Sequence, residues 1–309
     1  GLFKINKTDN SIEEIDLQLS TLTKQLHVRK LLLVGNNLVI ATEGNGVIVL
    51  NIRTLQARQF YQGNSLLKSN IVWDLHADSE GDISIATNKG VNFLKIKEKK
   101  VRVIKELDDV IGSKVIKTIF EDKAGVIWVG TETDGLYKLK SLANADHYIY
   151  DANRTTSLSS NQINVIFEDC FGIIWIGTQS GVNKFDKQKQ YFKHHQHWPN
   201  KLNTINSNMV WSIYQDNNDN LLIGTNKGLN IFNRVTGELN TYEPDYSFTM
   251  QNKKKSVYSI FKDHNDITYV GTDGGVFYFK DGELLHIDNI EHQNEERTYS
   301  IIEDKENKL

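Results

Sequence analysis

The amino-acid sequence predicts an all-β fold, a seven-bladed β-propeller of four-stranded antiparallel blades. Three observations lead to this prediction. A unit of 44 to 47 residues repeats along the chain, each unit holds four short apolar or aromatic runs separated by turn residues, and helical periodicity is nearly absent. A period of about 40–50 residues with four strands per unit is typical of propeller blades.

A threonine marks the repeat. It ends an apolar run and follows a glycine in four units and an alanine in two. A short polar link and a further apolar run come after it, as in "GIIWIGTQSGVNKF" at residues 172–185. The six blade repeats are centred near Thr42, Thr87, Thr131, Thr178, Thr225 and Thr272.

In five units an aspartate lies nine residues before the repeated threonine, as in "NVIFED" at 164–169. An aspartate that opens a tight turn accepts backbone N–H groups, and the Gly or Asn that follows tolerates a positive φ. The run before this turn, the Gly-Thr run, the "GVNKF" run and a polar-aromatic run such as "QYFKHH" (190–195) make four strands. A continuous apolar run such as "INVIF" (163–167) fits an inner strand that is packed on both faces.

The two ends of the chain predict a seventh blade, split between residues 298–309 and residues 1–20. "TYSIIEDKENKL" (298–309) resembles the first strand and turn of a unit, and "GLFKIN" (1–6) resembles a third strand. Joining them closes a single propeller over residues 1–309 and removes its sheet edges. The sequence contains no Gly-Thr strand for this blade, so we expect adjoining residues of a longer chain to supply it.

Composition excludes several classes of protein. The net charge of −3 predicts no nucleic-acid footprint, and no apolar run approaches the roughly 18–20 residues of a membrane helix, so no membrane contact by this segment is expected. Cys170 is the only cysteine and rules out an intrachain disulfide. Its turn lacks the nearby base that a reactive thiolate needs.

The unit "SLSSNQINVIFEDCFGIIWIGTQSGVNKFD" (157–186) resembles the two-component regulator propeller repeat. It recurs at 203–233 and more weakly in the other units. The resemblance implies a periplasmic sensor domain, the extracytoplasmic part of a longer inner-membrane receptor such as a hybrid histidine kinase or a diguanylate cyclase. It also implies an adjoining second propeller and a homodimer in the full receptor as partners.

A column of residues lies five positions before each turn aspartate. Four aromatic members of this column could stack on sugar rings, while its lysine and asparagine bond to hydroxyl groups; packing between blades is the alternative role. Acidic residues on the loops after the second strands would share the same face. The candidate ligand-binding residues are therefore Trp73, Lys117, Asn164, Trp211, Tyr258, Tyr299, Glu132, Asp134 and Asp273.

No catalytic residue, metal site or cofactor is predicted. His195 and His197 share one face of an expected exposed outer strand, but no acidic or cysteine partner accompanies them at a recognisable spacing. Trp128, Trp175 and Tyr269, each three residues before a repeated threonine, are expected in the core.

We expect the domain to sense a small-molecule or oligosaccharide ligand. Two alternatives stay open from the sequence. One is a carbohydrate-active lyase or hydrolase that uses Glu43, Glu132, Asp134 or Asp273, and the other is a protein-interaction platform.

Overall fold

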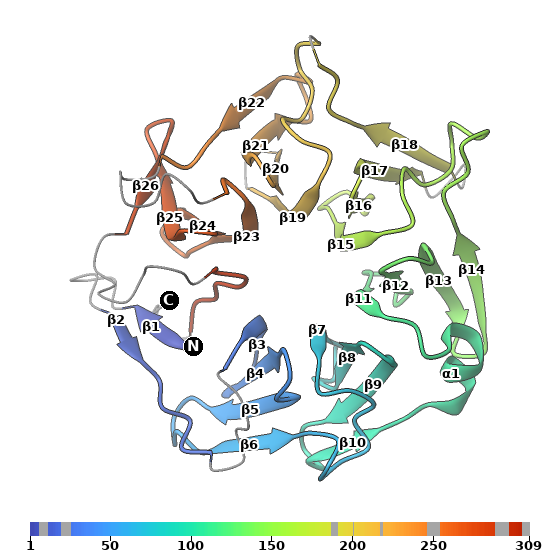
Figure 1. Cartoon of the computed structure of the whole chain (residues 1–309), viewed down its shortest axis with the longest axis vertical. Helices are drawn as coiled ribbons and strands as arrows, with labels where there is room; N and C mark the ends of the chain where they lie inside the picture. The colour runs from blue at the N-terminus through green and yellow to red at the C-terminus, as the bar shows by residue number, and fades with distance from the viewer. Residues whose placement is uncertain are drawn as a thin grey trace. The chain divides into compact units, whose positions relative to one another are not determined.

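The computed structural model describes residues 1–5, 12–19, 26–186, 191–199, 201–216, 219–245, 254–287 and 297–304. These residues form six four-stranded antiparallel sheets, one two-stranded sheet and one short helix. Each four-stranded sheet is a propeller blade whose strands follow one another in chain order (Figure 1). The all-β propeller predicted from the repeat is therefore observed.

The chain divides into two compact units. The first comprises residues 1–3, 14–149 and 161–163, and the second comprises residues 4–13, 150–160 and 164–309. The strands of blades 1 to 3 are β3 (Val28–Val34), β4 (Asn37–Thr42), β5 (Val47–Asn51), β6 (Ala57–Phe60), β7 (Val72–Ala77), β8 (Ile83–Thr87), β9 (Gly90–Lys95), β10 (Lys100–Arg102), β11 (Ile116–Glu121), β12 (Ile127–Thr131), β13 (Leu136–Ser141) and β14 (Asn144–Tyr148).

Blades 4 to 6 belong to the second unit. Their strands are β15 (Ile163–Glu168), β16 (Ile174–Thr178), β17 (Gly181–Asp186), β18 (Tyr191–His195), β19 (Val210–Gln215), β20 (Asn220–Thr225), β21 (Gly228–Asn233), β22 (Leu239–Tyr242), β23 (Val257–Lys262), β24 (Thr268–Thr272), β25 (Gly275–Lys280) and β26 (Glu283–His286).

Turn aspartates fold the first hairpin of blades 2 to 6. Oδ1 of Asp169 accepts the backbone N–H groups of Phe171 and Ile173, both at 2.9 Å. The same pattern recurs at Asp78, Asp122 and Asp263. In blades 3 and 4 the second carboxylate oxygen also accepts the indole N–H of the core tryptophan, as in Asp169 with Trp175 at 2.9 Å. This confirms the predicted turn chemistry.

The repeated threonine closes the second hairpin. In all six blades its hydroxyl donates to the carbonyl oxygen of the glycine at, or directly before, the start of the third strand, as Thr178 does to Gly181 at 2.9 Å. The glycine before the threonine has a different role. A Cβ at Gly224 would lie 2.6 Å from the carbonyl oxygen of Val257 in the next blade, so only glycine permits this approach.

Apolar side chains fill the space between neighbouring blades of each unit. Ala41 and Val47 of blade 1 pack with Val72 and Ile85 of blade 2 in one cluster of buried residues. In the second unit comparable clusters join blade 4 to blade 5 and blade 5 to blade 6. The second strands are buried on both faces as a result, and all five residues of β16 and of β24 are buried. The inner strands are less buried than expected, since β15 and β19 combine buried and half-buried residues.

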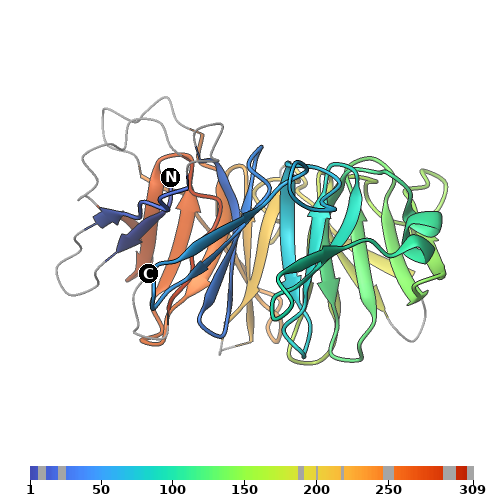
Figure 2. The ribbon, with the colours of Figure 1, turned by 90° about the horizontal axis from the view of Figure 1, so that it is seen from below.

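One helix was not predicted. Helix α1 (Lys105–Ile111) connects blades 2 and 3, buries Leu107 and Ile111, and contacts β9 and β14 at the outer side of these blades (Figure 2). Its two buried residues are four positions apart, which places them on one face. Seven residues are too few for a clear helical period in the sequence.

The described residues contain six complete blades, and the predicted count of seven is not reached. The predicted third strand near the N-terminus is β1 (Phe3–Ile5), which pairs only with β2 (Ile12–Glu14). Residues 298–304, the described part of the predicted first strand and turn at 298–309, are not paired as a strand. The parts of the predicted blade at 6–11, 20 and 305–309 lie outside the described residues.

Residues 297–304 nevertheless pack on blade 6. A Cβ at Gly271 would lie 2.4 Å from the carbonyl oxygen of Thr298, as one at Gly224 would approach Val257. Ile301 packs against Tyr269 and Val276 of that blade. The segment therefore occupies the place that the inner strand of a further blade would take.

Candidate ligand-binding surface

A β-bulge positions the predicted column of residues. In five blades the pairing of the inner strand with the second strand shifts by one residue next to the first pair, which leaves one residue unpaired. Such a bulge bends the strand and re-aims the side chain of the extra residue. The bulged residues are Arg29, Trp73, Lys117, Trp211 and Tyr258.

Arg29 is the member of this column that the sequence reasoning missed. Blade 1 lacks the turn aspartate that located the column in the other blades, so counting back five residues could not reach Arg29. The distance from the repeated threonine would not have found it either, because the shorter turn of blade 1 puts Val28 at the spacing that the other members have.

In the first unit, Trp73 is surrounded by cations. The Nζ atom of Lys117 lies 3.1 Å from the centroid of the Trp73 ring, and the guanidinium carbon of Arg29 lies 4.7 Å from it. The indole N–H donates to Oδ1 of Asn88 at 2.6 Å. Arg29 also pairs with Glu43. Cation–π contacts of this kind stabilise a charge that is partly withdrawn from water.

Burial lowers the pKa of Lys117 to about 8, while the charge of Glu132 opposes this shift and that of Arg29 adds to it. Lys117 and Glu132 are therefore electrostatically coupled beside Trp73. This lysine loses its proton far more easily than an exposed lysine does.

Asp134 belongs to a different group of residues in the same unit. Its Oδ2 atom accepts a hydrogen bond from the Tyr137 hydroxyl at 2.5 Å. The same oxygen lies 3.5 Å from Nζ of Lys114 and 3.6 Å from Nε2 of His147. The rings of Tyr137 and His147 stack with centroids 4.2 Å apart. Burial, followed by the bond to Asp134, raises the pKa of Tyr137.

In the second unit the structure brings three predicted aromatic residues together. The ring centroids of Trp211 and Tyr258 are 5.5 Å apart, and those of Tyr258 and Tyr299 are 4.8 Å apart. All three side chains are half-buried. We call this group, together with Asp273, the aromatic surface.

Polar groups accompany the aromatic surface. The hydroxyl of Tyr258 donates to Oδ1 of Asp273 at 3.1 Å, and Nε of Arg297 lies 2.7 Å from the same oxygen. Burial raises the pKa of Tyr258 to about 12. Among the described residues, the indole N–H of Trp211 and Oδ2 of Asp273 are buried without a hydrogen-bond partner. A buried donor and a buried acceptor of this kind are expected to meet a ligand or ordered water.

Asn164 is not part of the aromatic contacts. Its amide donates to the carbonyl oxygen of Val210 at 2.7 Å and approaches the sulfur of Met209 at 3.8 Å. Its side chain therefore ties blade 4 to the inner strand of blade 5.

Buried asparagines hold the loops that lead into the inner strands. Oδ1 of Asn183 accepts the N–H of Ser159 at 2.9 Å, and Asn92 and Asn230 make the same bond to Lys68 and Asn206. The sequence reasoning passed over these residues. The signal was present, because "GVN" or "GLN" recurs at the start of three third strands.

The residues expected in the core are buried: Trp128, Trp175 and Tyr269 are at most 8% exposed. The expectation of exposed outer-strand histidines is wrong. His195 is half-buried, with its ring tilted against that of Trp175 at 5.8 Å, and Nδ1 of His197 lies 2.8 Å from the carbonyl oxygen of Ile205. Packing between blades 4 and 5 draws this strand inward.

Among the described residues, one group has the spacing of metal ligands: Asp263, His264 and Glu303. Its contacts have a structural explanation. Glu303 accepts the backbone N–H of His264 at 3.1 Å, as Gln215 accepts that of Cys170 at 2.7 Å between blades 4 and 5. This glutamate therefore acts as a link from residues 297–304 to blade 6.

Two stretches of the chain, residues 110–133 and 204–227, match the family described as two component regulator propeller. Each stretch covers one inner strand and the Gly-Thr strand that pairs with it, namely β11 with β12 and β19 with β20. The chain carries two component regulator propeller repeats. A comparison with curated protein sequences finds no match.

Three solved structures illustrate the shared fold of this repeat propeller. The extracellular domain assigned to the hybrid two component system BT3049 of B. thetaiotaomicron has a TM-score of 0.64 at 18% identity over 96% of this chain and 45% of that domain. The extracellular domain of BT4673 from the same organism has a TM-score of 0.54 at 16% identity, over 87% of this chain and 42% of that one. PorZ, a surface component of the type-IX secretion system of Porphyromonas gingivalis, has a TM-score of 0.59 at 14% identity, over 82% of this chain and 38% of that one.

The repeat propeller spans less than half of the length of each of these three chains. Within the part that the structure describes, no helix has the length and hydrophobicity needed to cross a lipid bilayer.

Proposed function

We propose that this propeller is the extracytoplasmic ligand-sensing domain of a bacterial signal-transduction receptor and that the aromatic surface binds an oligosaccharide. The observation that carries the proposal is the run of three rings, Trp211, Tyr258 and Tyr299, beside the carboxylate of Asp273. Aromatic faces with nearby polar groups suit sugar rings, which have an apolar face and hydroxyl edges.

The unpartnered atoms support a hydroxylated ligand. Sugar hydroxyl groups both accept and donate hydrogen bonds, so they match the chemistry of the unpartnered Trp211 indole N–H and of Oδ2 of Asp273. In the first unit, Lys117 and Arg29 lie over the ring of Trp73, so this ring is less available for stacking on a sugar. We therefore place the sugar at the aromatic surface.

The proposal favours binding over catalysis. Asp273, Asp134 and Glu43 each lie beside a cation, namely Arg297, Lys114 and Arg29. Glycoside hydrolases use two carboxyl groups that flank the scissile bond, whereas each of these three carboxylates is paired with a cation.

Binding produces a signal only if the ligand prefers one arrangement of the receptor over another. We propose that the longer protein contains an adjoining second propeller, forms a homodimer and places this domain in the periplasm. The extracellular domains that resemble this propeller are more than twice its length, which supports the second propeller.

We also propose that residues 297–304 are the inner strand of a seventh blade, completed by residues 1–20 and by a strand from elsewhere in the longer protein. The contacts of Thr298 and Glu303 support it, because they repeat the contacts of Val257 and Gln215.

Isothermal titration calorimetry with a panel of oligosaccharides tests the sensor function, with product analysis for each hit. We expect Trp211→Ala to weaken a hit about fivefold or more, because stacking on an aromatic ring contributes about 1 kcal/mol or more. Tyr258→Phe, which removes only the hydroxyl bonded to Asp273, should have a smaller effect.

Tyr150→Ala is the matched control, since Tyr150 is a half-exposed aromatic residue of the same unit outside the aromatic surface. Unchanged affinity in a folded Trp211→Ala variant would remove the assigned site. Consumption of the ligand would favour an enzyme, and retention of a protein partner that no sugar displaces would favour an interaction platform.

A further inference from the structure

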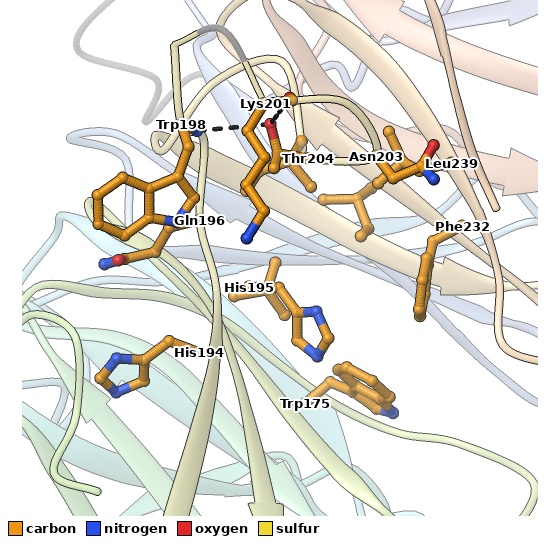
Figure 3. Close-up of a pocket in the computed structure, with 13 residues that line it drawn as sticks. Trp175, His194, His195, Gln196, Trp198, Lys201, Asn203, Thr204, Phe232 and Leu239 are labelled. Carbon is orange, nitrogen blue, oxygen red and sulfur yellow. Dashed lines mark hydrogen bonds between the residues drawn. The ribbon is translucent and has the colours of Figure 1, made fainter. Parts of the chain in front are cut away.

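A cavity of about 170 Å³ lies between blade 4 and blade 5, under the loop that connects β18 to β19 (Figure 3). It shares no residue with the aromatic surface. Its walls come from β16, β17 and β18 on one side and from β20, β21 and β22 on the other. The wall residues that matter for the argument are Trp175, His195, Ile223, Phe232 and Leu239.

The floor of the cavity is aromatic and apolar. The ring of His195 stands between those of Trp175 and Phe232, with centroids 5.8 Å and 5.6 Å away. Burial lowers the pKa of His195 to about 4, and the charges of Lys193 and Lys184 add to the shift. At neutral pH the imidazole is therefore uncharged and the floor offers three neutral rings.

Lys201 places a positive charge at the mouth of the cavity. The side chain of Lys201 extends over the floor toward His195 (Figure 3). Within the described residues, the ammonium group of Lys201 forms no ion pair. The loop around it is folded by its own bonds: Lys201 N–H donates to the Trp198 carbonyl at 3.1 Å, and the Thr204 hydroxyl donates to the Lys201 carbonyl at 3.2 Å.

The neighbouring interface shows how such a space is filled elsewhere. Tyr242 pairs with Leu229 in blade 5 as His195 pairs with Val182 in blade 4. The Tyr242 ring packs edge-on against Phe279 at 4.8 Å. A shorter imidazole in place of the phenol, and a valine in place of the leucine, leave more room between blades 4 and 5.

We propose that this cavity binds a small aromatic carboxylate, with its ring on the floor and its carboxylate on Lys201. The volume is close to that of an engineered apolar cavity, about 150 Å³, that takes up benzene. The apolar walls stabilise the ring, and the ammonium group of Lys201 supplies the charge complementary to a carboxylate.

Benzoate is the probe, and its binding is measured by calorimetry and by saturation-transfer NMR on the whole protein. We expect saturable binding with one site. Benzyl alcohol, which has the ring without the charge, should bind more weakly, and acetate, which has the charge without the ring, should not bind measurably.

Lys201→Gln should weaken benzoate about tenfold, the loss expected for one charge-assisted hydrogen bond, and leave benzyl alcohol within about twofold. Lys227→Gln is the matched control, because Lys227 lies in blade 5 outside the cavity. His195→Tyr should fill the cavity as Tyr242 does and abolish binding of both ring compounds.

Circular dichroism and the melting temperature establish that each variant is folded. Absence of saturable benzoate binding in the low-millimolar range would overturn the proposal. So would an equal loss in the Lys227→Gln control, or retained binding in folded His195→Tyr. None of these outcomes depends on whether the aromatic surface binds an oligosaccharide.

Discussion

At the scale of single residues, the inner-strand bulge decides what each blade presents. The same backbone shift carries Arg29 in blade 1, Trp73 in blade 2 and Trp211 in blade 5. The scaffold is therefore constant, and the exposed chemistry changes with one residue per blade. This is how a repeat fold can change its ligand without changing its core.

Lys117 makes a residue-scale prediction about pH. Its pKa is about 8 in the folded protein and about 10.4 in an unfolded chain, so the unfolded state binds more protons between these values. The free energy of unfolding should therefore gain a rising contribution as pH increases from about 8 to about 10.4. Lys117→Met should remove that rise and stabilise the protein below pH 8.

Urea unfolding at several pH values measures this effect, with Lys114→Met as the control. Identical pH profiles for the original protein and Lys117→Met would show that Lys117 is not held in the buried position beside Trp73.

At the scale of elements, the repeated contacts explain why the blades share a pattern that loops do not. The turn aspartate, the Gly-Thr pair and the buried asparagine each bond to backbone groups of the same blade, as Asp169, Thr178 and Asn183 do in blade 4.

Residues 297–304 give an element-scale prediction. Ile301→Ala should lower the free energy of unfolding by about 1–3 kcal/mol, because Ile301 packs on Tyr269 and Val276 and its loss leaves a cavity. Ile213 is buried at the same position in blade 5, so the loss of unfolding free energy in Ile213→Ala gives the value expected for a complete blade.

Leu202→Ala is the neutral control, since Leu202 is 89% exposed. Urea denaturation compares the three variants. If Ile301→Ala is as neutral as Leu202→Ala, residues 297–304 do not serve as the inner strand of a further blade.

At the scale of the whole molecule, the two proposed sites use different parts of the repeat. The aromatic surface includes bulged residues of β19 and β23, which are inner strands, whereas the cavity is lined by the second, third and fourth strands of blades 4 and 5 and by a connecting loop. They share no residue. A repeat fold of this kind can bind two ligands independently, because each blade contacts only its neighbours and each interface packs separately.

This separation predicts additive stabilisation. A ligand present at one hundred times its dissociation constant adds about 2.7 kcal/mol to the free energy of unfolding, and two uncoupled ligands add their contributions. Thermal-shift measurements with an oligosaccharide hit, with benzoate and with both should show this. A combined shift well below the sum would indicate that binding at one site weakens binding at the other.

The sequence by itself determined the propeller class, the strands of the blades, the turn chemistry and the core aromatics. These features depend on local bonds and on a side-chain pattern that repeats with every blade, so a single chain displays them several times. It predicted a column of candidate residues for the same reason, although it missed Arg29, where the repeat is irregular.

Only the tertiary structure decided which of those residues meet. Trp211, Tyr258 and Tyr299 form a run of rings, while Trp73 is covered by Lys117 and Arg29, because each contact joins different blades. The inward turn of His195 and the cavity beside it also arise from the fit between two blades. Such contacts join residues tens of positions apart, and no repeat within one blade encodes them.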